Sequence, residues 1–227
     1  MSVPFILKRQ AALLAAALAA AAPLSAWAVD GITDRPGDFL ATFAGSASSL
    51  DLDVLAATVT YNPGTDIFTF TSTQSGPVGL TATGLYVWGV NRGAGTAGFA
   101  ANGLPGVLFD SVLLLRPNGT GSIGANQLPA GAVTISGNTI TGVVSGSLLA
   151  STGFSKNNYT FNLWPRNTAV GSGFTQIADF APDNSNFTAT VVPEPGSLAL
   201  MSLGLAAGLL WRRRSAALSE AAGSPRS

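Results

Sequence analysis

One uninterrupted stretch decides the fold: Thr58-Val59-Thr60-Tyr61, then Asn62-Pro63-Gly64-Thr65-Asp66, then Ile67-Phe68-Thr69-Phe70-Thr71. The outer two segments alternate apolar residues with threonine, which is the period of a strand with one buried face. The middle segment is a cluster of turn-forming residues. The stretch therefore predicts a β-hairpin.

Short runs rich in β-branched and aromatic residues continue through the middle of the chain, separated by Gly, Pro and Asn. They cover residues 85–90, 107–115, 133–136, 139–147, 159–164 and 187–192. Many short strands with turn signals are typical of antiparallel sandwiches. We therefore predict an all-β fold, a single antiparallel β-sandwich or jelly-roll-like domain over residues 29–192. A β-solenoid is the alternative, but no fixed repeat period supports it.

The polar positions of these strands are mostly Thr, Ser and Asn, so the predicted surface presents hydroxyls and amides rather than charges. Threonine suits an exposed strand because its β-branch favours extended backbone and its hydroxyl meets water. Such a surface matches the neutral hydroxyls of a polysaccharide matrix. Many secreted β-proteins have the same surface without binding sugar, so this alternative stays open.

Composition excludes several kinds of chemistry. The 227 residues include no Cys and no His, which rules out disulfides, Cys or His metal sites, a Ser-His-Asp triad and a His general base. Residues 29–192 carry five basic and nine acidic side chains, a net charge of −4. A mildly acidic domain is a poor nucleic-acid binder, because contacts to phosphates need clustered Lys and Arg.

The N-terminus has the order of features of an export signal. Lys8 and Arg9 precede an apolar run at residues 11–22, and Ala26-Trp27-Ala28 supplies the small residues that signal peptidase requires. We predict a signal peptide over residues 1–28, with a signal helix and cleavage after Ala28.

The C-terminus carries a second targeting region. Pro193-Glu194-Pro195 precedes residues 197–211, which carry no charge, and these are followed by Arg212, Arg213 and Arg214. We predict a transmembrane helix that the three arginines stop and orient, with the arginines and residues 215–227 in the cytosol. Residues 29–192 then lie across the membrane, in agreement with the N-terminal signal.

This arrangement of Pro193, Glu194 and Pro195, a short apolar segment and an arginine cluster resembles the PEP-CTERM sorting signal of Gram-negative bacteria. The resemblance covers residues 193–214 and implies that an exosortase-type transpeptidase in the inner membrane recognises and removes the tail. It further implies transient anchoring in the inner membrane, release to the cell surface or extracellular matrix, and association with exopolysaccharide and biofilm. The family usually ends a few residues after the arginines, whereas this chain continues to Ser227.

Paired aspartates are the acidic candidates. Asp51 and Asp53 are two residues apart, so they would project from one face of a strand, where they could hold Ca²⁺ or act as acid and base. A solvated strand edge is the interpretation we favour. Asp179 and Asp183 favour a capped turn over a ligand pair. The glycine-rich run at residues 93–98 lacks the Lys of a phosphate loop and favours a flexible loop.

Aromatic residues are the candidate ligand contacts. Tyr86 and Trp88 are two apart and share one predicted sheet face, while Trp164 faces away from Phe161 and Leu163. Aromatic rings stack on the apolar face of a sugar ring. The alternative is that these rings belong to the core, as most do in a small β-domain.

Arg166 is the remaining candidate contact. Pro165 is expected to end the preceding strand, and Arg166 follows it directly. Its guanidinium could hold the carboxylate of Asp110 or Asp179, or a ligand.

These features together predict an exported cell-surface or matrix protein with a structural or adhesive role, no cofactor, no metal and no catalysis. A carbohydrate-binding module is the alternative. An Asp-dependent polysaccharide hydrolase is the weaker third possibility, because such enzymes need a pair of carboxylates, one with a raised pKa.

Overall fold

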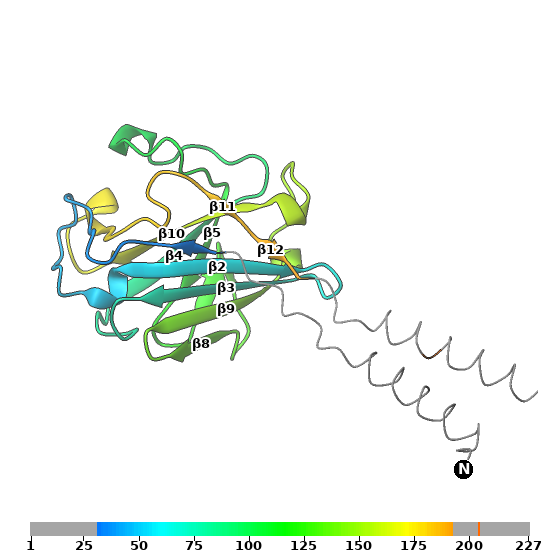
Figure 1. Ribbon diagram of the computed structural model, residues 1–227, viewed down its shortest axis with the longest axis horizontal. Helices are drawn as coiled ribbons and strands as arrows, with labels where there is room; N and C mark the ends of the chain where they lie inside the picture. The colour runs from blue at the N-terminus through cyan, green and yellow to red at the C-terminus, as the bar shows by residue number, and fades with distance from the viewer. Residues whose placement is uncertain (1–30, 193–203, 205–227) are drawn as a thin grey trace, which may run out of the picture.

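The computed structural model describes residues 31–192 and Gly204, and it forms two antiparallel sheets packed face to face (Figure 1). The first, sheet A, has the strand order β1-β2-β3-β9-β8, with β12 paired to β2. Its strands are β1 (Ile32–Thr33), β2 (Val54–Asn62), β3 (Ile67–Gln74), β8 (Val133–Ser136), β9 (Thr139–Ser145) and β12 (Thr190–Val191).

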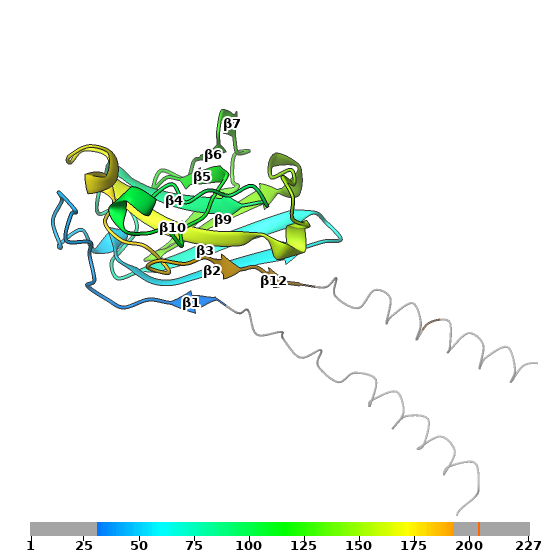
Figure 2. The same ribbon diagram turned by 90° about the horizontal axis from the view of Figure 1, so that it is seen from above.

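The second sheet, sheet B, has the order β11-β10-β4-β5-β6-β7, and in the turned view its strands β4, β5 and β6 lie above β2 and β3 of sheet A (Figure 2). Its strands are β4 (Gly84–Asn91), β5 (Ser111–Leu115), β6 (Gly121–Ile123), β7 (Asn126–Gln127), β10 (Thr160–Asn167) and β11 (Phe187–Thr188). Five 3₁₀ helices complete the described secondary structure: η1 (Leu50–Leu52), η2 (Ala100–Asn102), η3 (Gly146–Leu148), η4 (Lys156–Asn158) and η5 (Gly173–Gln176).

The predicted hairpin is β2 and β3, joined at residues 63–66 in antiparallel register with Asn62 opposite Ile67. Asn62 shapes the turn because its Oδ1 accepts the N–H groups of Gly64 and Thr65. The all-β antiparallel sandwich is confirmed; the pairing of β12 with β2 is parallel.

The main core lies between the sheets. Phe68, Phe70 and Tyr61 enter it from sheet A and meet Trp88 and Phe161 from sheet B. The rings of Phe70 and Trp88 pack edge to face with centroids 5.3 Å apart, and those of Phe70 and Phe161 do so at 5.5 Å. Aromatic burial of this kind supplies much of the stability of a small sandwich.

Strands β4 and β10 of sheet B are buried on both faces, whereas the alternating pattern predicted one buried and one hydrated face for each sheet. A second apolar cluster covers its outer face, where Trp164 packs against Phe99, Phe109 and Phe180 from two long loops. Sheet A follows the expected rule, because the outward residues of β2, β3 and β9 are only part-buried or exposed.

The expectation that Pro165 ends its strand is wrong. Strand β10 runs on to Asn167, and Pro165 pairs with Tyr86 of β4. The Pro165 carbonyl accepts the N–H of Ala178. Because the N–H and C=O of one strand residue point to the same side, the N–H that Pro165 lacks would also have faced the loop around Ala178 and not β4. A proline is tolerated where no sheet neighbour needs its N–H.

The predicted signal peptide and the apolar C-terminal helix lie outside the described residues, apart from Gly204, which is helical. Among the residues described, no helix has both the length and the apolar character required to cross a membrane.

Candidate functional site

The predicted aromatic contacts are core residues. Tyr86 and Trp88 are fully enclosed between the sheets, and Trp164 is enclosed in the second apolar cluster. A sugar would reach Tyr86 and Trp88 only if the two sheets separated, and Trp164 only if the covering loops moved away. Phe154, at 40% exposure, is the one aromatic among the exposed large apolar side chains of the described chain.

Arg166 pairs with neither of its expected partners. Its guanidinium donates to the side chain of Gln176, and burial lowers the pKa of Arg166. Asp110 is bound instead by Arg92, whose Nε lies 2.9 Å from Asp110 Oδ1. Arg92 directly follows β4, and Asp110 lies eighteen residues later, just before β5. No local sequence motif marks this pair.

Asp51 and Asp53 are not a solvated strand edge. Asp51 lies in η1 and Asp53 directly follows it, and both are buried. Asp51 accepts hydrogen bonds from the N–H and hydroxyl of Thr81, while Asp53 accepts from Gly37 N–H and the Ser75 hydroxyl. These carboxylates tie the β1–β2 connection to the β3–β4 connection at the end of the sandwich, because a buried carboxylate requires donors.

Asp53 is also part of an acidic cluster that the sequence pattern did not reveal. Its five members are Asp34, Asp38, Asp53, Asp179 and Asp183, and their carboxylate oxygens form two overlapping groups, each within 4.8 Å. They come from two connections far apart in the sequence, β1–β2 and β10–β11, so no spacing in the sequence could have predicted them. Oxygen donors at such distances suit a hard cation such as Ca²⁺, and acidic groups of this kind are also common without one.

Three carboxyls of the cluster have a raised pKa. Burial raises the pKa of Asp179 to about 8, although hydrogen bonds from Val54 and Phe180 oppose the shift. Burial likewise raises the pKa of Asp34 to about 6 and raises that of Asp38. Carboxylates this close together cannot all be ionised unless a cation compensates their charge, and otherwise some of them keep a proton.

The glycine-rich run at residues 93–98 does not form a phosphate cradle. Asn91 Oδ1 accepts the N–H groups of Gly93 and Gly95, and Asp110 accepts that of Ala94. The backbone donors that would bind a phosphate are therefore already used within the loop.

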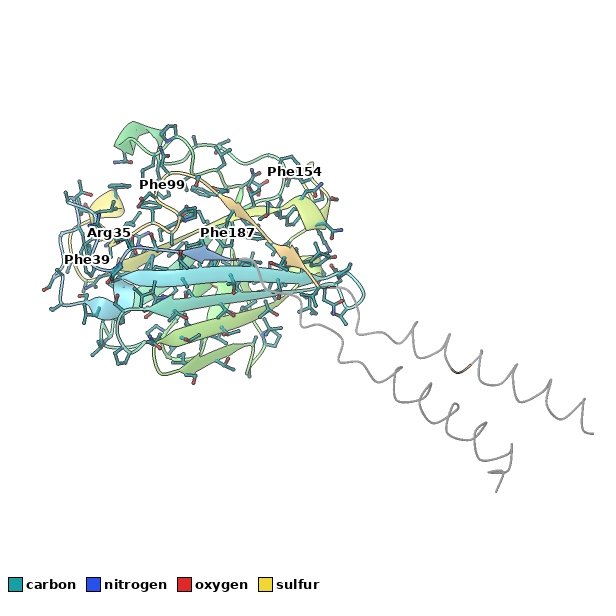
Figure 3. All side chains as sticks on the ribbon, viewed as in Figure 1. Arg35, Phe39, Phe99, Phe154 and Phe187 are labelled. Carbon is teal, nitrogen blue, oxygen red and sulfur yellow. The ribbon has the colours of Figure 1, made fainter. Side chains whose placement is uncertain are left out.

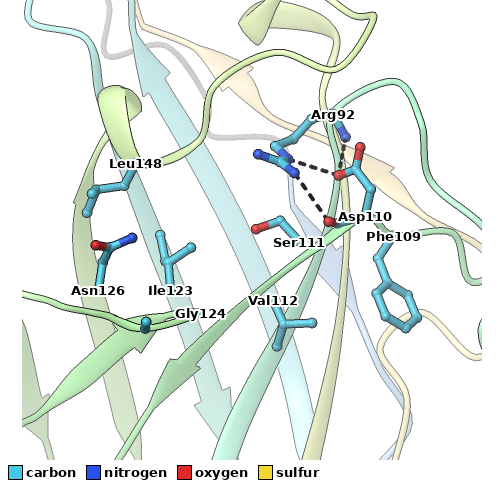
Figure 4. Close-up of a pocket in the computed structure, with 10 residues that line it drawn as sticks. Arg92, Phe109, Asp110, Ser111, Val112, Ile123, Gly124, Asn126 and Leu148 are labelled. Carbon is cyan, nitrogen blue, oxygen red and sulfur yellow. Dashed lines mark hydrogen bonds and ion pairs between the residues drawn. The ribbon is translucent and has the colours of Figure 1, made fainter.

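A pocket of about 500 Å³ opens beside this loop (Figure 4). Arg92 and Asp110 form one side, Leu148 and Asn126 the other, and Val112 contributes to the wall between them. Although burial opposes the change, hydrogen bonds from Thr152 and Arg92 lower the pKa of Asp110. The pocket thus combines an internally paired charge with an exposed amide and an apolar wall, which suits a small neutral polar ligand.

A regular surface is formed by the outward side of sheet A, which we call the threonine face. One row crosses four strands in register, with Thr58 opposite Thr71, Thr71 opposite Thr141 and Thr141 opposite Thr134. The face carries Thr58, Thr60, Thr69, Thr71, Thr73, Thr134, Thr139 and Thr141, and Val143, 42% exposed, lies opposite Thr69.

The threonine face is ordered and neutral. The hydroxyls of Thr71 and Thr141, and those of Thr73 and Thr139, lie 3.2 Å apart across β3 and β9. Strands β2, β3, β8 and β9 contain no charged residue. Hydroxyl rows therefore repeat at about 4.8 Å across the strands and about 6.7 Å along them.

The C-terminal strand leads from the sandwich directly into the targeting tail. Val191 is paired with Tyr61, and the Val192 N–H donates to the Tyr61 carbonyl at 2.9 Å. The predicted signal cleavage at Ala26 and Ala28 and the residues of the tail lie outside the described part of the chain.

Fold and tail together define an all-β protein with a C-terminal sorting signal. The family model of the PEP-CTERM protein-sorting motif matches residues 191–214. The chain therefore carries the signal that Pro193, Glu194, Pro195 and the three arginines predicted, which implies export, transient membrane anchoring and processing by an exosortase, a membrane transpeptidase. A search of curated proteins finds no match to the chain.

Proposed function

We propose that this protein is a structural or adhesive component of the cell surface or extracellular matrix, and that its threonine face contacts neutral exopolysaccharide. The observation that carries the proposal is the uncharged array of hydroxyls in register across four strands. Hydroxyls exchange hydrogen bonds with water for similar bonds to sugar hydroxyls, and no charge has to be desolvated. A broad array gives many weak contacts, which suits adhesion to a polymer.

The proposed role is not catalytic. The carboxyls with raised pKa belong to the acidic cluster, where Asp53 and Asp179 are buried and the oxygens of each group lie within 4.8 Å. This leaves no room for a glycosidic bond between them. The pocket contains one carboxylate, that of Asp110, which forms an ion pair with Arg92. A glycosidase needs two carboxyl groups flanking the bond.

The test places charge on the threonine face in the native host. In the double variant Thr71→Lys with Thr141→Lys, two ammonium groups interrupt the central row, and we expect several-fold more protein to leave the matrix in a mild wash. Thr188→Lys is the matched control, because Thr188 is exposed on β11, away from the face. Thermal unfolding checks that the variants stay folded. Equal retention of all three folded proteins would refute the assignment of the face.

The signal processing is tested separately. Removing Pro193-Glu194-Pro195 while keeping residues 197–214 should leave full-length protein in the inner membrane. N-terminal sequencing of the exported form should begin at Val29. A surface form of the native protein that keeps Arg212 to Arg214 would contradict removal of the tail.

The pocket favours a second candidate function, a carbohydrate-binding module that holds one sugar unit. Asn126 and Ser111 offer amide and hydroxyl groups beside an apolar wall that includes Val112 and Leu148. Asn126→Ala should abolish binding of short neutral oligosaccharides, measured by calorimetry, if the pocket is the site. Loss of binding in the threonine-face variant alone would favour the first function.

A further inference from the structure

The exit of the chain from the sandwich restricts how the domain can sit while its tail is anchored. Val192 is hydrogen-bonded to Tyr61 at the end of β2, and only residues 193–196 separate it from the uncharged segment 197–211. Four residues reach at most about 14 Å even when fully extended. The end of the sandwich that carries Val192 must therefore stay close to the membrane surface.

We call this part the exit end and define it as residues 61–66, 145–148 and 152–158. The segments are linked through Asp66, whose carbonyl accepts the Gly146 N–H and whose carboxylate lies 2.7 Å from Lys156 Nζ. Phe154 N–H donates to the Arg92 carbonyl at 2.8 Å, which brings the loop of Phe154 to the same end. Figure 3 places Phe154 on the side of the sandwich toward which β12 runs, and Arg35 and Phe39 at the opposite side.

The exit end has the side chains of an interfacial contact. Phe154 is 40% exposed. Lys156, two residues later, offers a long apolar stem that ends in an ammonium group. Aromatic rings and lysine stems are favoured at the boundary between headgroups and hydrocarbon.

The charge distribution gives the same orientation. At the exit end Lys156 is paired with Asp66, and Arg92, whose carbonyl accepts the Phe154 N–H, is paired with Asp110. The acidic cluster lies at the other end of β2, because Asp179 accepts the N–H of Val54. The nine residues of β2 span about 27 Å. An anionic lipid surface repels the acidic end and tolerates the neutral one.

We propose that the exit end rests on the outer leaflet of the membrane that holds the tail, with Phe154 in the headgroup region. The partner is the lipid surface itself. This inference rests on the proposed sorting of the protein, since an unanchored chain has no tether. Contact at two points, the tail and Phe154, would hold Pro193-Glu194-Pro195 at a constant height and rotation for the exosortase.

The experiment uses the absence of cysteine from the chain. Full-length protein carrying Ser155→Cys or Ala47→Cys is labelled with a nitroxide and reconstituted in vesicles of phosphatidylethanolamine and phosphatidylglycerol. Both positions are exposed, but Ala47 lies in the loop before η1, which precedes the far end of β2. We expect a water-soluble paramagnetic agent to reach the label at position 155 several-fold less than the label at position 47. Equal accessibility would overturn the inference.

Two further variants separate contact from tethering. Phe154→Ala should restore accessibility at position 155, whereas Leu80→Ala should not, because Leu80 is 59% exposed but lies beside Asp51 at the other end. A flexible Gly-Ser linker of about 20 residues after Val192, with a mean reach of about 25 Å, should also raise accessibility. Unchanged protection in Phe154→Ala would refute the role of Phe154.

Tail removal in the host is measured in parallel, so that the two proposals fail in different ways. If the native tail is never removed, the sorting function is wrong. If the tail is removed while the label at position 155 stays as accessible as the label at position 47, the docking inference alone is wrong.

Discussion

Raising the pH from 5 to 8 should destabilise this protein, because the buried carboxyl of Asp179 must then ionise. The side chain is 1% exposed, and burial raises its pKa from 3.8 to about 8, with the carboxyls of Asp34 and Asp38 acting in the same direction. The hydrogen bonds from Val54 and Phe180 do not compensate for the lost hydration.

The sign follows from proton linkage. Between about pH 4 and pH 8 the folded protein keeps a proton on Asp179 that the unfolded chain has lost, so the free energy of unfolding falls as pH rises. Four pH units at 1.36 kcal/mol each give an upper limit of about 5 kcal/mol across this window. Asp34 contributes in the same sense up to its pKa of about 6. Asp66 and Asp110 have lowered pKa values, so their contribution is lost only in stronger acid, below the window.

The assay is urea unfolding followed by tryptophan fluorescence at several pH values between 5 and 9. Asp179→Asn removes the titration and keeps the size of the side chain. Its NH₂ group opposes one of the two backbone donors, so we expect a loss of about 1–3 kcal/mol at pH 5. Its stability should then fall only between pH 5 and 6, where Asp34 still titrates, and stay nearly flat from there to pH 8.

Asp66→Asn is the control, because it removes an exposed ion pair and should leave the slope between pH 5 and 8 unchanged. A wild-type stability that is constant or rises over this interval, or an Asp179→Asn variant with the wild-type slope, would show that the reasoning about burial is wrong.

Three further predictions concern packing and charge. Phe70→Ala deletes a fully buried ring and should lower the free energy of unfolding by about 3–5 kcal/mol, whereas Thr71→Ala on the opposite face of β3 should cost under about 1 kcal/mol, both measured in urea. Gly89→Ala places a Cβ 2.4 Å from the ring of Trp164, so it should cost about 1–3 kcal/mol and shift the tryptophan emission. Lys156→Ala should change stability by less than about 1 kcal/mol, a difference that disappears in high salt.

The sequence by itself determined the features that depend on neighbouring residues. Alternation in residues 58–71 predicted the hairpin of β2 and β3 because side chains in a strand point to opposite faces at every second position. The same rule placed Tyr86 and Trp88 on one face of β4 and Trp164 on the opposite side of β10 from Phe161. The sorting signal was also readable, since membrane enzymes recognise a short linear segment.

Only the tertiary structure decided which faces are buried and which carboxylates meet. Trp164 could not be assigned to a surface or a core until the loops bearing Phe99 and Phe180 were seen to cover sheet B. Asp179 is 125 residues from its donor Val54, and no periodicity links positions at such a separation. Period and turn chemistry act within a few residues, whereas burial, and with it the pKa of a carboxyl, depends on whatever the folded chain brings over it.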